Sequence, residues 1–291
     1  ETTGLNQDAD NFSGTIFGTG AAIAEMRIDN LANNAIINIS HNVSTSLTGN
    51  IKTDTAADAL TVNIGGTAGN VTLASLIPST TYETVTVNSQ GTEANTLSAV
   101  GIVINNMTFT GSTAITVPST DNITGVVDFT ASTANNTVTV TDTTAQTISF
   151  GSGNDTITTG VVASSTQTIN GGAGNDTMTA GIITTAGVLQ LNGDAGSDTI
   201  TVAAMTGATT ASSATINGGT GVDFITLDAN SGNSVVVVST ATTLADADKI
   251  TGFTTAVDDF DYNGALLNDT ATTITAVSNA TLAGGIAADV D

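Results

Sequence analysis

The chain has 291 residues, of which 40% are hydrophobic, and its 26 Asp and Glu against 3 Lys and Arg give a formal net charge of −23. The apolar content excludes a disordered acidic tail, and the scarcity of basic residues excludes a nucleic-acid partner. Without cysteine the chain has neither disulfides nor thiolate metal sites, while about a fifth of it is Thr, with Gly 31 and Pro 2, as is typical of turn-rich all-β proteins.

Residues 1–100 predict a β-rich N-terminal region. Runs rich in β-branched and apolar residues at 36–39, 60–64 and 84–87 predict short strands. Residues 21–30 predict a short helix. The start at Glu1 has neither an initiator Met nor a signal peptide, so we expect a mature or excised fragment.

Two other features of this region carry no function. Gly18-Thr19-Gly20 opens like a dinucleotide-binding fingerprint, but position 23 is Ile and no βαβ unit surrounds it. His41 is the single histidine, so neither a Ser-His-Asp relay nor a histidine-rich metal site can be built. We expect an ordinary surface or strand position for it.

Four internal repeats follow, and they predict a solenoid. They read FGSGNDTI at 150–157, GGAGNDTM at 171–178, GDAGSDTI at 193–200 and GGTGVDFI at 218–225. Their aspartates are separated by 21, 22 and 25 positions, and strand-like runs at 167–170, 188–191 and 214–217 lie between them. Since one coil cannot bury its apolar face alone, the coils must stack.

Degraded copies extend the repeat on both sides. Asn136 and Asp248 stand where the aspartate of a further coil is expected, and Asn95 and Asp58 are weaker echoes. We therefore predict a parallel β-solenoid over 101–245. Residues 246–291 predict a C-terminal cap, truncated at Asp291, because the glycines disappear there and Phe253, Phe260 and Tyr262 enter.

The loops carry the residue types of a calcium site. Their glycines allow a positive φ and turn backbone carbonyls toward one point, and each Asp supplies a hard anionic oxygen. Stacked about 4.8 Å apart, the aspartates would repel by about 3 kcal/mol for each neighbouring pair, so the column needs cations between its members. The candidate ligating residues are Gly151, Gly153, Asp155, Gly172, Gly174, Asp176, Gly193, Gly196, Asp198, Gly219, Gly221, Asp223 and Asp248.

These loops resemble the nonapeptide GGxGxDxUx of the RTX (hemolysin-type calcium-binding repeat) family, over about a quarter of the chain. The resemblance implies a parallel β-roll that binds Ca²⁺, type I secretion, and folding in extracellular calcium. The chain departs from the family in having one motif per coil. Asp194 replaces the second glycine of the third loop, and Phe150 the first glycine of the first loop.

In composition the chain is similar to bacterial surface-layer (S-layer) proteins. That implies a secreted structural protein on the cell surface, which self-assembles into a lattice of its own copies, with cell-surface polysaccharide or lipopolysaccharide as a further partner. No stretch is long and apolar enough to cross a bilayer. The alternative is a calcium-dependent adhesin or the carrier domain of a larger RTX protein.

Two other functions fit the sequence less well. An acidic-sugar lyase needs basic residues, and the chain offers only Arg27, Lys52 and Lys249 and no Trp, so we expect no enzyme. A Thr-rich solenoid could bind ice, but the loop positions Ser152, Ala173, Ala195 and Thr220 do not repeat as Thr. The β-propensity of Thr is the simpler explanation for its abundance.

Overall fold

The computed structural model describes residues 13–16, 23–51, 53, 55, 57–66, 69–78, 82–141, 144–203, 212–227, 235–239, 248–252 and 259–262. Every regular element in these ranges is a β-strand, and the strands stack in parallel as a β-solenoid with coils of roughly 22 residues, as predicted. The chain divides into two compact units, residues 1–142 with 146–156, and residues 143–145 with 157–291. The boundaries expected at 100 and 245 stay predictions, and most of the expected cap lies outside the described residues.

In the first unit the chain alternates between two parallel sheets. The order of one sheet is β1 (Ser13–Ile16), β3 (Asn34–Ile39), β5 (Ala59–Ile64), β8 (Thr84–Ser89), β10 (Ile104–Gly111), β12 (Ile123–Ser132) and β14 (Gln146–Ser149). The order of the other is β2 (Ile23–Leu31), β4 (Val43–Ile51), β6 (Thr72–Leu73), β9 (Asn95–Leu97), β11 (Ile115–Val117) and β13 (Thr137–Val140), and β7 (Leu76–Pro78) also pairs with β4. The strands predicted at 36–39, 60–64 and 84–87 are confirmed as β3, β5 and β8.

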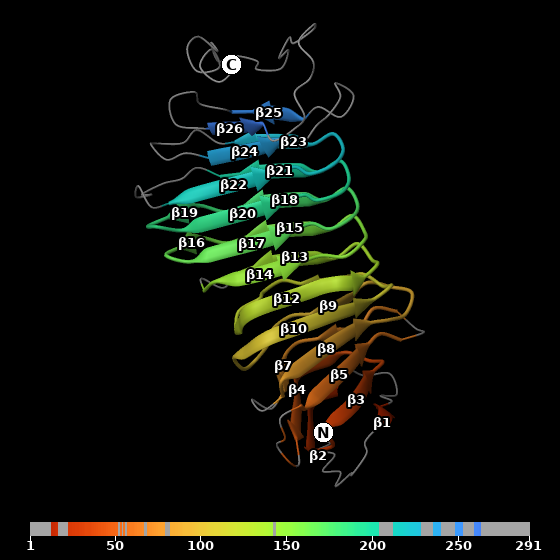
Figure 1. Ribbon diagram of the computed structural model, residues 1–291. Coiled ribbons are helices and arrows are strands. Elements are labelled where there is room, and N and C mark those ends of the chain that lie inside the picture. The colour runs from red at the N-terminus through yellow and green to blue at the C-terminus, as the bar shows by residue number, and fades with distance from the viewer. Residues whose placement is uncertain are drawn as a thin grey trace, which may run out of the picture. The chain divides into compact units, whose positions relative to one another are not determined.

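The second unit repeats this arrangement (Figure 1). Its first sheet contains β17 (Thr166–Asn170), β20 (Val188–Asn192), β22 (Ser213–Asn217), β24 (Val235–Ser239) and β26 (Asp259–Tyr262). The other sheet contains β15 (Thr156–Thr159), β18 (Thr177–Ala180), β21 (Thr199–Val202), β23 (Phe224–Leu227) and β25 (Lys249–Thr251). A small sheet pairs β16 (Val162–Ala163) with β19 (Ile183–Thr184). The strands predicted at 167–170, 188–191 and 214–217 are confirmed as β17, β20 and β22.

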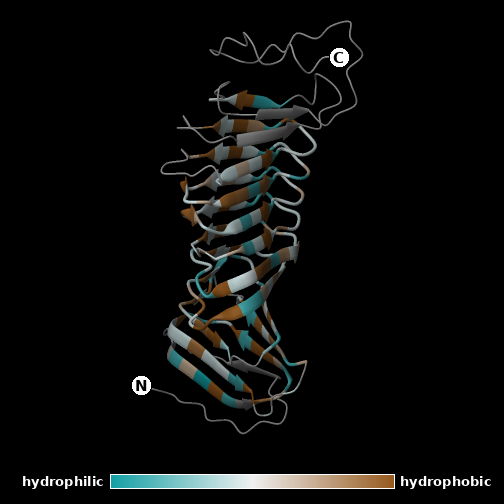
Figure 2. Ribbon diagram, turned by 60° about the vertical axis from the view of Figure 1, so that its left-hand side comes forward, coloured by the Kyte–Doolittle hydropathy of each residue, from teal (hydrophilic) through white to brown (hydrophobic). Residues whose placement is uncertain are grey.

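Alternation of apolar and polar residues places the core between the sheets. In β5 the side chains of Leu60, Val62 and Ile64 are fully buried, and in β20 those of Leu189 and Leu191 are. Figure 2 shows the same alternation of hydrophobic and hydrophilic positions along individual strands. Each such side chain contributes about 1.5–3 kcal/mol when it leaves water, so stacked coils stabilise one another.

The helix predicted for residues 21–30 is wrong, because residues 23–30 lie in the strand β2; residues 21 and 22 lie outside the described residues. Glu25 and Arg27 are exposed, whereas Met26 and Ile28 are buried. This is the two-residue period of a strand. The strand is held by its parallel pairing with β4 over Ile23–Leu31, a long-range contact that outweighs the local helix propensity of the segment.

Identical side chains form columns along the stack. In the first unit the rings of Phe109, Phe129 and Phe150 are stacked, with centroids 4.3 Å and 4.9 Å apart. Phe150 is the residue that replaces the first glycine of the first loop, and it is 3% exposed. Its ring therefore continues a core column of the first unit, which explains why this loop departs from the glycine pattern.

Candidate metal centre

The loop aspartates point into the solenoid. Asp155 precedes β15, Asp176 precedes β18, Asp198 precedes β21 and Asp223 precedes β23, and each is at most 1% exposed. An isolated carboxylate at such a position is costly, because burial removes its hydration. Each of these side chains therefore needs a partner inside the wall of the solenoid.

One carboxylate oxygen of Asp155, Asp198, Asp223 and Asp248 has a backbone partner in the preceding coil. The amide N–H of Asp176 donates to Oδ1 of Asp198 at 2.7 Å, and that of Asp198 donates to Oδ1 of Asp223 at 2.8 Å. The amide of Asp223 in turn donates to the half-buried Asp248 at 3.2 Å. In the first unit the amide of Asn136 donates to Asp155 at 2.5 Å. The predicted column is thus in register from Asp176 to Asp248.

The other carboxylate oxygen of Asp198 and of Asp223 is buried and accepts no hydrogen bond. The Oδ2 atom of Asp198 and the carbonyl oxygen of Gly218 both lie 2.3 Å from the position that a Cβ on Gly193 would take. Two oxygen acceptors therefore lie on the side of Gly193 where a side chain would be. Such a pair is stable only with a proton, a donor or a cation between its members.

Burial raises the pKa of these carboxyls. The pKa of Asp198 rises to about 6, mainly by burial, against the opposing hydrogen bond from the Asp176 amide. The pKa of Asp155 also rises to about 6 through burial, although the Asn136 amide lowers it. The pKa of Asp223 rises to about 7, because burial is reinforced by the charge of Asp248. At pH 7 the carboxyl groups of Asp155 and Asp198 are therefore mostly ionised, so negative charge is buried inside the solenoid.

The loop glycines provide the tight backbone that this packing requires. Gly172, Gly174, Gly196, Gly219 and Gly221 have φ between +89° and +144°, and Gly153 has +154°. At Gly196 a Cβ would lie 1.8 Å from the carbonyl oxygen of Gly174. Asp194, where the sequence replaces a glycine, adopts the same left-handed region with φ +70°. Its carboxylate accepts from the amide of Gly172 at 3.2 Å, which connects adjacent coils.

The two remaining glycines of the predicted metal site, Gly151 and Gly193, do not have a positive φ. They are needed for space: at Gly151 a Cβ would lie 2.1 Å from the carbonyl oxygen of Ser132, and at Gly193 it would meet the Asp198 carboxylate.

Asparagine occupies the same column in the first unit. Asn136 accepts from the amide of Ile115 at 3.2 Å, and Asn95 accepts from that of Val71 at 2.8 Å. The sequence predicts Asn95 only as a weak echo, yet it lies in the column. Each coil contributes one residue to the column, called a rung below, and the rung between the two asparagines is the apolar Ile115, which breaks the pattern. Asp58 does not belong to the column, because it precedes β5 in the other sheet and accepts from Thr55.

The side-chain amide of each asparagine satisfies the oxygens around it. The Nδ2 group of Asn136 donates to the carbonyl of Ala134 at 2.9 Å and to the hydroxyl of Ser132 at 3.1 Å. The Nδ2 group of Asn95 donates to the carbonyls of Gln90 at 2.8 Å and Ile64 at 3.1 Å. An asparagine in the column therefore satisfies the neighbouring oxygen atoms without an ion. An aspartate at the same position has a carboxylate oxygen in place of the amide donor.

These features fit a hard cation such as Ca²⁺, which prefers carboxylate and carbonyl oxygens. Asp176 repeats the arrangement, with its Oδ2 atom 2.5 Å and the carbonyl oxygen of Gly193 2.7 Å from the Cβ position of Gly171. Among the residues that the structure describes, no three carboxylate or imidazole groups converge. Backbone carbonyls would therefore supply much of the coordination.

Replacing Asp198 with asparagine should stabilise the protein in chelator at pH 7 by about 1–3 kcal/mol, because the new amide can donate to the Gly218 carbonyl. The reciprocal change Asn136→Asp should destabilise it by a similar amount. Urea unfolding in chelator measures both variants against the wild type. If Asp198→Asn is the less stable protein in chelator, the account of the unpartnered oxygen is wrong.

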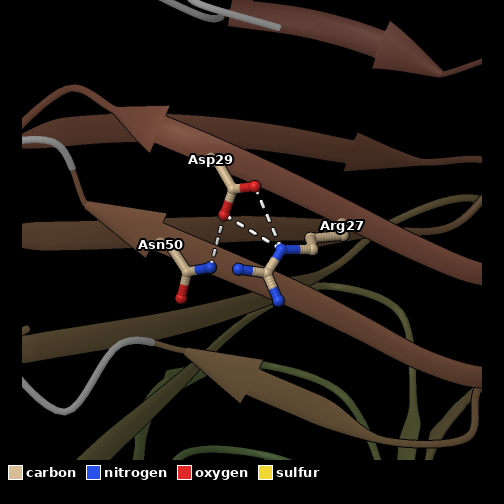
Figure 3. Close-up of polar contacts among 3 residues, drawn as sticks. All are labelled: Arg27, Asp29 and Asn50. Carbon is tan, nitrogen blue, oxygen red and sulfur yellow. Dashed lines mark hydrogen bonds and ion pairs between the residues drawn. The ribbon is translucent and has the colours of Figure 1, made fainter. Parts of the chain in front are cut away.

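The few other polar candidates have structural roles. Arg27 donates to Asp29 at 3.0 Å and 3.1 Å, and Asn50 donates to the same carboxylate (Figure 3). The hydrogen bond from Arg27 is the largest cause that lowers the pKa of Asp29. His41 is half-buried and its Nδ1 atom pairs with the hydroxyl of Ser40 at 3.0 Å.

Comparison with protein-family models, with curated proteins and with solved structures finds no match for the chain. Within the ranges that the structure describes, no helix has the length and apolar character needed to span a membrane.

Proposed function

We propose that this chain is a calcium-binding structural protein of a secreted bacterial surface layer. The observation that carries the proposal is the contrast between the two kinds of rung. Asn95 and Asn136 satisfy their surroundings with an amide, whereas Asp198 and Asp223 bury an oxygen that has no hydrogen-bond partner. A divalent cation bound there would neutralise the column and join adjacent coils, so the second unit would be rigid only in calcium.

The residues that would hold the ion are the loop residues already named, with the carboxylates of Asp155, Asp176, Asp198, Asp223 and Asp248 as the charged members. The bound ion would supply only electrostatic stabilisation, so we propose a role without catalysis. Dependence on extracellular calcium suits a protein that is exported by type I secretion and folds at the cell surface. The proposed partners are further copies of the chain and a cell-surface polysaccharide or lipopolysaccharide.

Assembly is tested by electron microscopy of the purified protein in calcium and in chelator. We expect ordered sheets or filaments in calcium that disperse when chelator is added, because the subunits lose their rigid second unit. The Asp198→Ala variant serves as a matched control and should need more calcium for the same order. Absence of ordered assemblies at every calcium level, together with calcium-dependent folding, would favour the adhesin or carrier-domain alternative.

A further inference from the structure

Threonine hydroxyls form a regular array on one sheet of the second unit. The outward positions of β18 and β21 are Thr177 and Thr179, and Thr199 and Thr201, paired in register as Thr177 with Thr199 and Thr179 with Thr201. The column of Thr179 and Thr201 continues in register through Thr226 and Thr251. We call these six residues, with the exposed Thr158 of the adjacent β15, the threonine face.

The array lies on strands and not on the loops. The loop positions Ser152, Ala173, Ala195 and Thr220 vary, whereas the strand positions repeat as Thr-x-Thr. The threonines of the face are exposed or half-exposed, because the residue between each pair, such as Met178 or Ile200, faces the core. β18, β21 and β23 run side by side in the second unit (Figure 1), so the face repeats in two directions.

The two repeat distances follow from sheet geometry. Neighbouring strands are about 4.8 Å apart, and alternate residues along a parallel strand are about 6.6 Å apart. Both distances are close to spacings between oxygen atoms in hexagonal ice. The hydroxyls are also within reach of one another: that of Thr251 donates to that of Thr226 at 3.2 Å.

The absence of carboxylates from the threonine face also bears on what it can bind. No carboxylate lies on β18, β21 or β23, although the chain has a net charge of −23, and the aspartates that directly precede these strands, Asp176, Asp198 and Asp223, are buried. In the second column Phe224 pairs with Thr199 and Lys249 pairs with Phe224, so the regular array ends on that side.

The opposite sheet of the same unit provides the contrast. Its outward positions hold Thr168, Gln190 and Thr215, which are not alike, and the adjacent Asn170 and Asn192 bond to each other at 2.7 Å. Among the described residues of the second unit, the threonine face is the sheet surface on which hydroxyl and methyl groups repeat from strand to strand.

We infer that the threonine face binds the surface of ice crystals, since a neutral hydroxyl array that repeats in two dimensions is complementary to a neutral lattice that does the same. This activity is distinct from the proposed calcium role and needs only the folded second unit.

The test measures the partition of the protein between slowly grown ice and the remaining liquid, with calcium present throughout. The wild type should enter the ice, and Thr179→Tyr and Thr201→Tyr should be excluded from it like serum albumin. The matched control Thr215→Tyr, on the opposite sheet, should partition like the wild type. Melting temperatures in calcium should be equal for all four proteins, which shows that the fold is retained.

Exclusion of the wild type from ice would overturn the inference, and so would equal partition of Thr179→Tyr and the wild type. Binding of the wild type to microcrystalline cellulose or chitin, with exclusion from ice, would also overturn it. Calcium-dependent melting is measured on the same samples, so the two proposals succeed or fail separately.

Discussion

Saturation with calcium is expected to raise the free energy of unfolding by about 2.7 kcal/mol for each site held at a hundredfold excess over its dissociation constant. The physical reason is that the unfolded chain has no preformed cluster of carboxylates and carbonyls, so the ion binds mainly to the native state. Differential scanning calorimetry in calcium and in chelator measures the effect. Several rungs acting together make this the largest change that we expect for the protein.

Two controls make this experiment specific. Magnesium at the same concentration should have a smaller effect, because it demands octahedral geometry and loses its water reluctantly. Asp176→Ala and Asp198→Ala should each reduce the calcium-dependent part of the melting temperature, since both residues connect to a neighbouring rung. Equal melting temperatures in calcium and in chelator would reject the metal site altogether.

In chelator the protein should lose stability as the pH rises from about 4 to about 7. The folded pKa values of Asp155, Asp198 and Asp223 are about 6, 6 and 7, above the ordinary value of 3.8. Between these limits the native state binds more protons than the unfolded state, so the free energy of unfolding falls with pH. A displacement of about two pH units corresponds to about 3 kcal/mol for each carboxyl.

Urea unfolding at a series of pH values checks this dependence. Calcium should remove most of it, because the bound ion takes the place of the protons, and calcium should therefore stabilise the protein more at pH 7 than at pH 5. A chelated protein whose stability rises between pH 4 and pH 7 would show that the buried carboxylates are already compensated by other groups.

The column changes along the chain from asparagine side chains, which are neutral, to aspartate side chains, which are ionisable. Asn95 and Asn136 lie in the first unit, together with Asp155 near its end, and Asp176, Asp198 and Asp223 lie in the second. The first unit also contains the stacked rings of Phe109, Phe129 and Phe150. On the proposed function, the part of the chain with asparagine rungs needs less calcium to fold than the part with aspartate rungs.

The sequence by itself determined the repeat. The spacing of Asp155, Asp176, Asp198 and Asp223 predicts one coil per motif, and the pairing register has that period. Strands were predictable where apolar residues alternate, because a two-residue period has a single favourable burial in a solenoid. Residues 21–30 were misassigned because local propensity is weaker than the pairing of β2 with β4.

Only the tertiary structure decided what the repeated residues face. Asn95 enters the column although its surroundings differ from the glycine motif, and Asp58 leaves it because it precedes a strand of the other sheet. The threonine face also required the register between coils, since the paired residues Thr177 and Thr199, like Thr179 and Thr201, are separated in sequence by the whole circuit of a coil. A sequence motif specifies backbone conformation and residue type, but the partner of each oxygen and hydroxyl is set by the neighbouring coil.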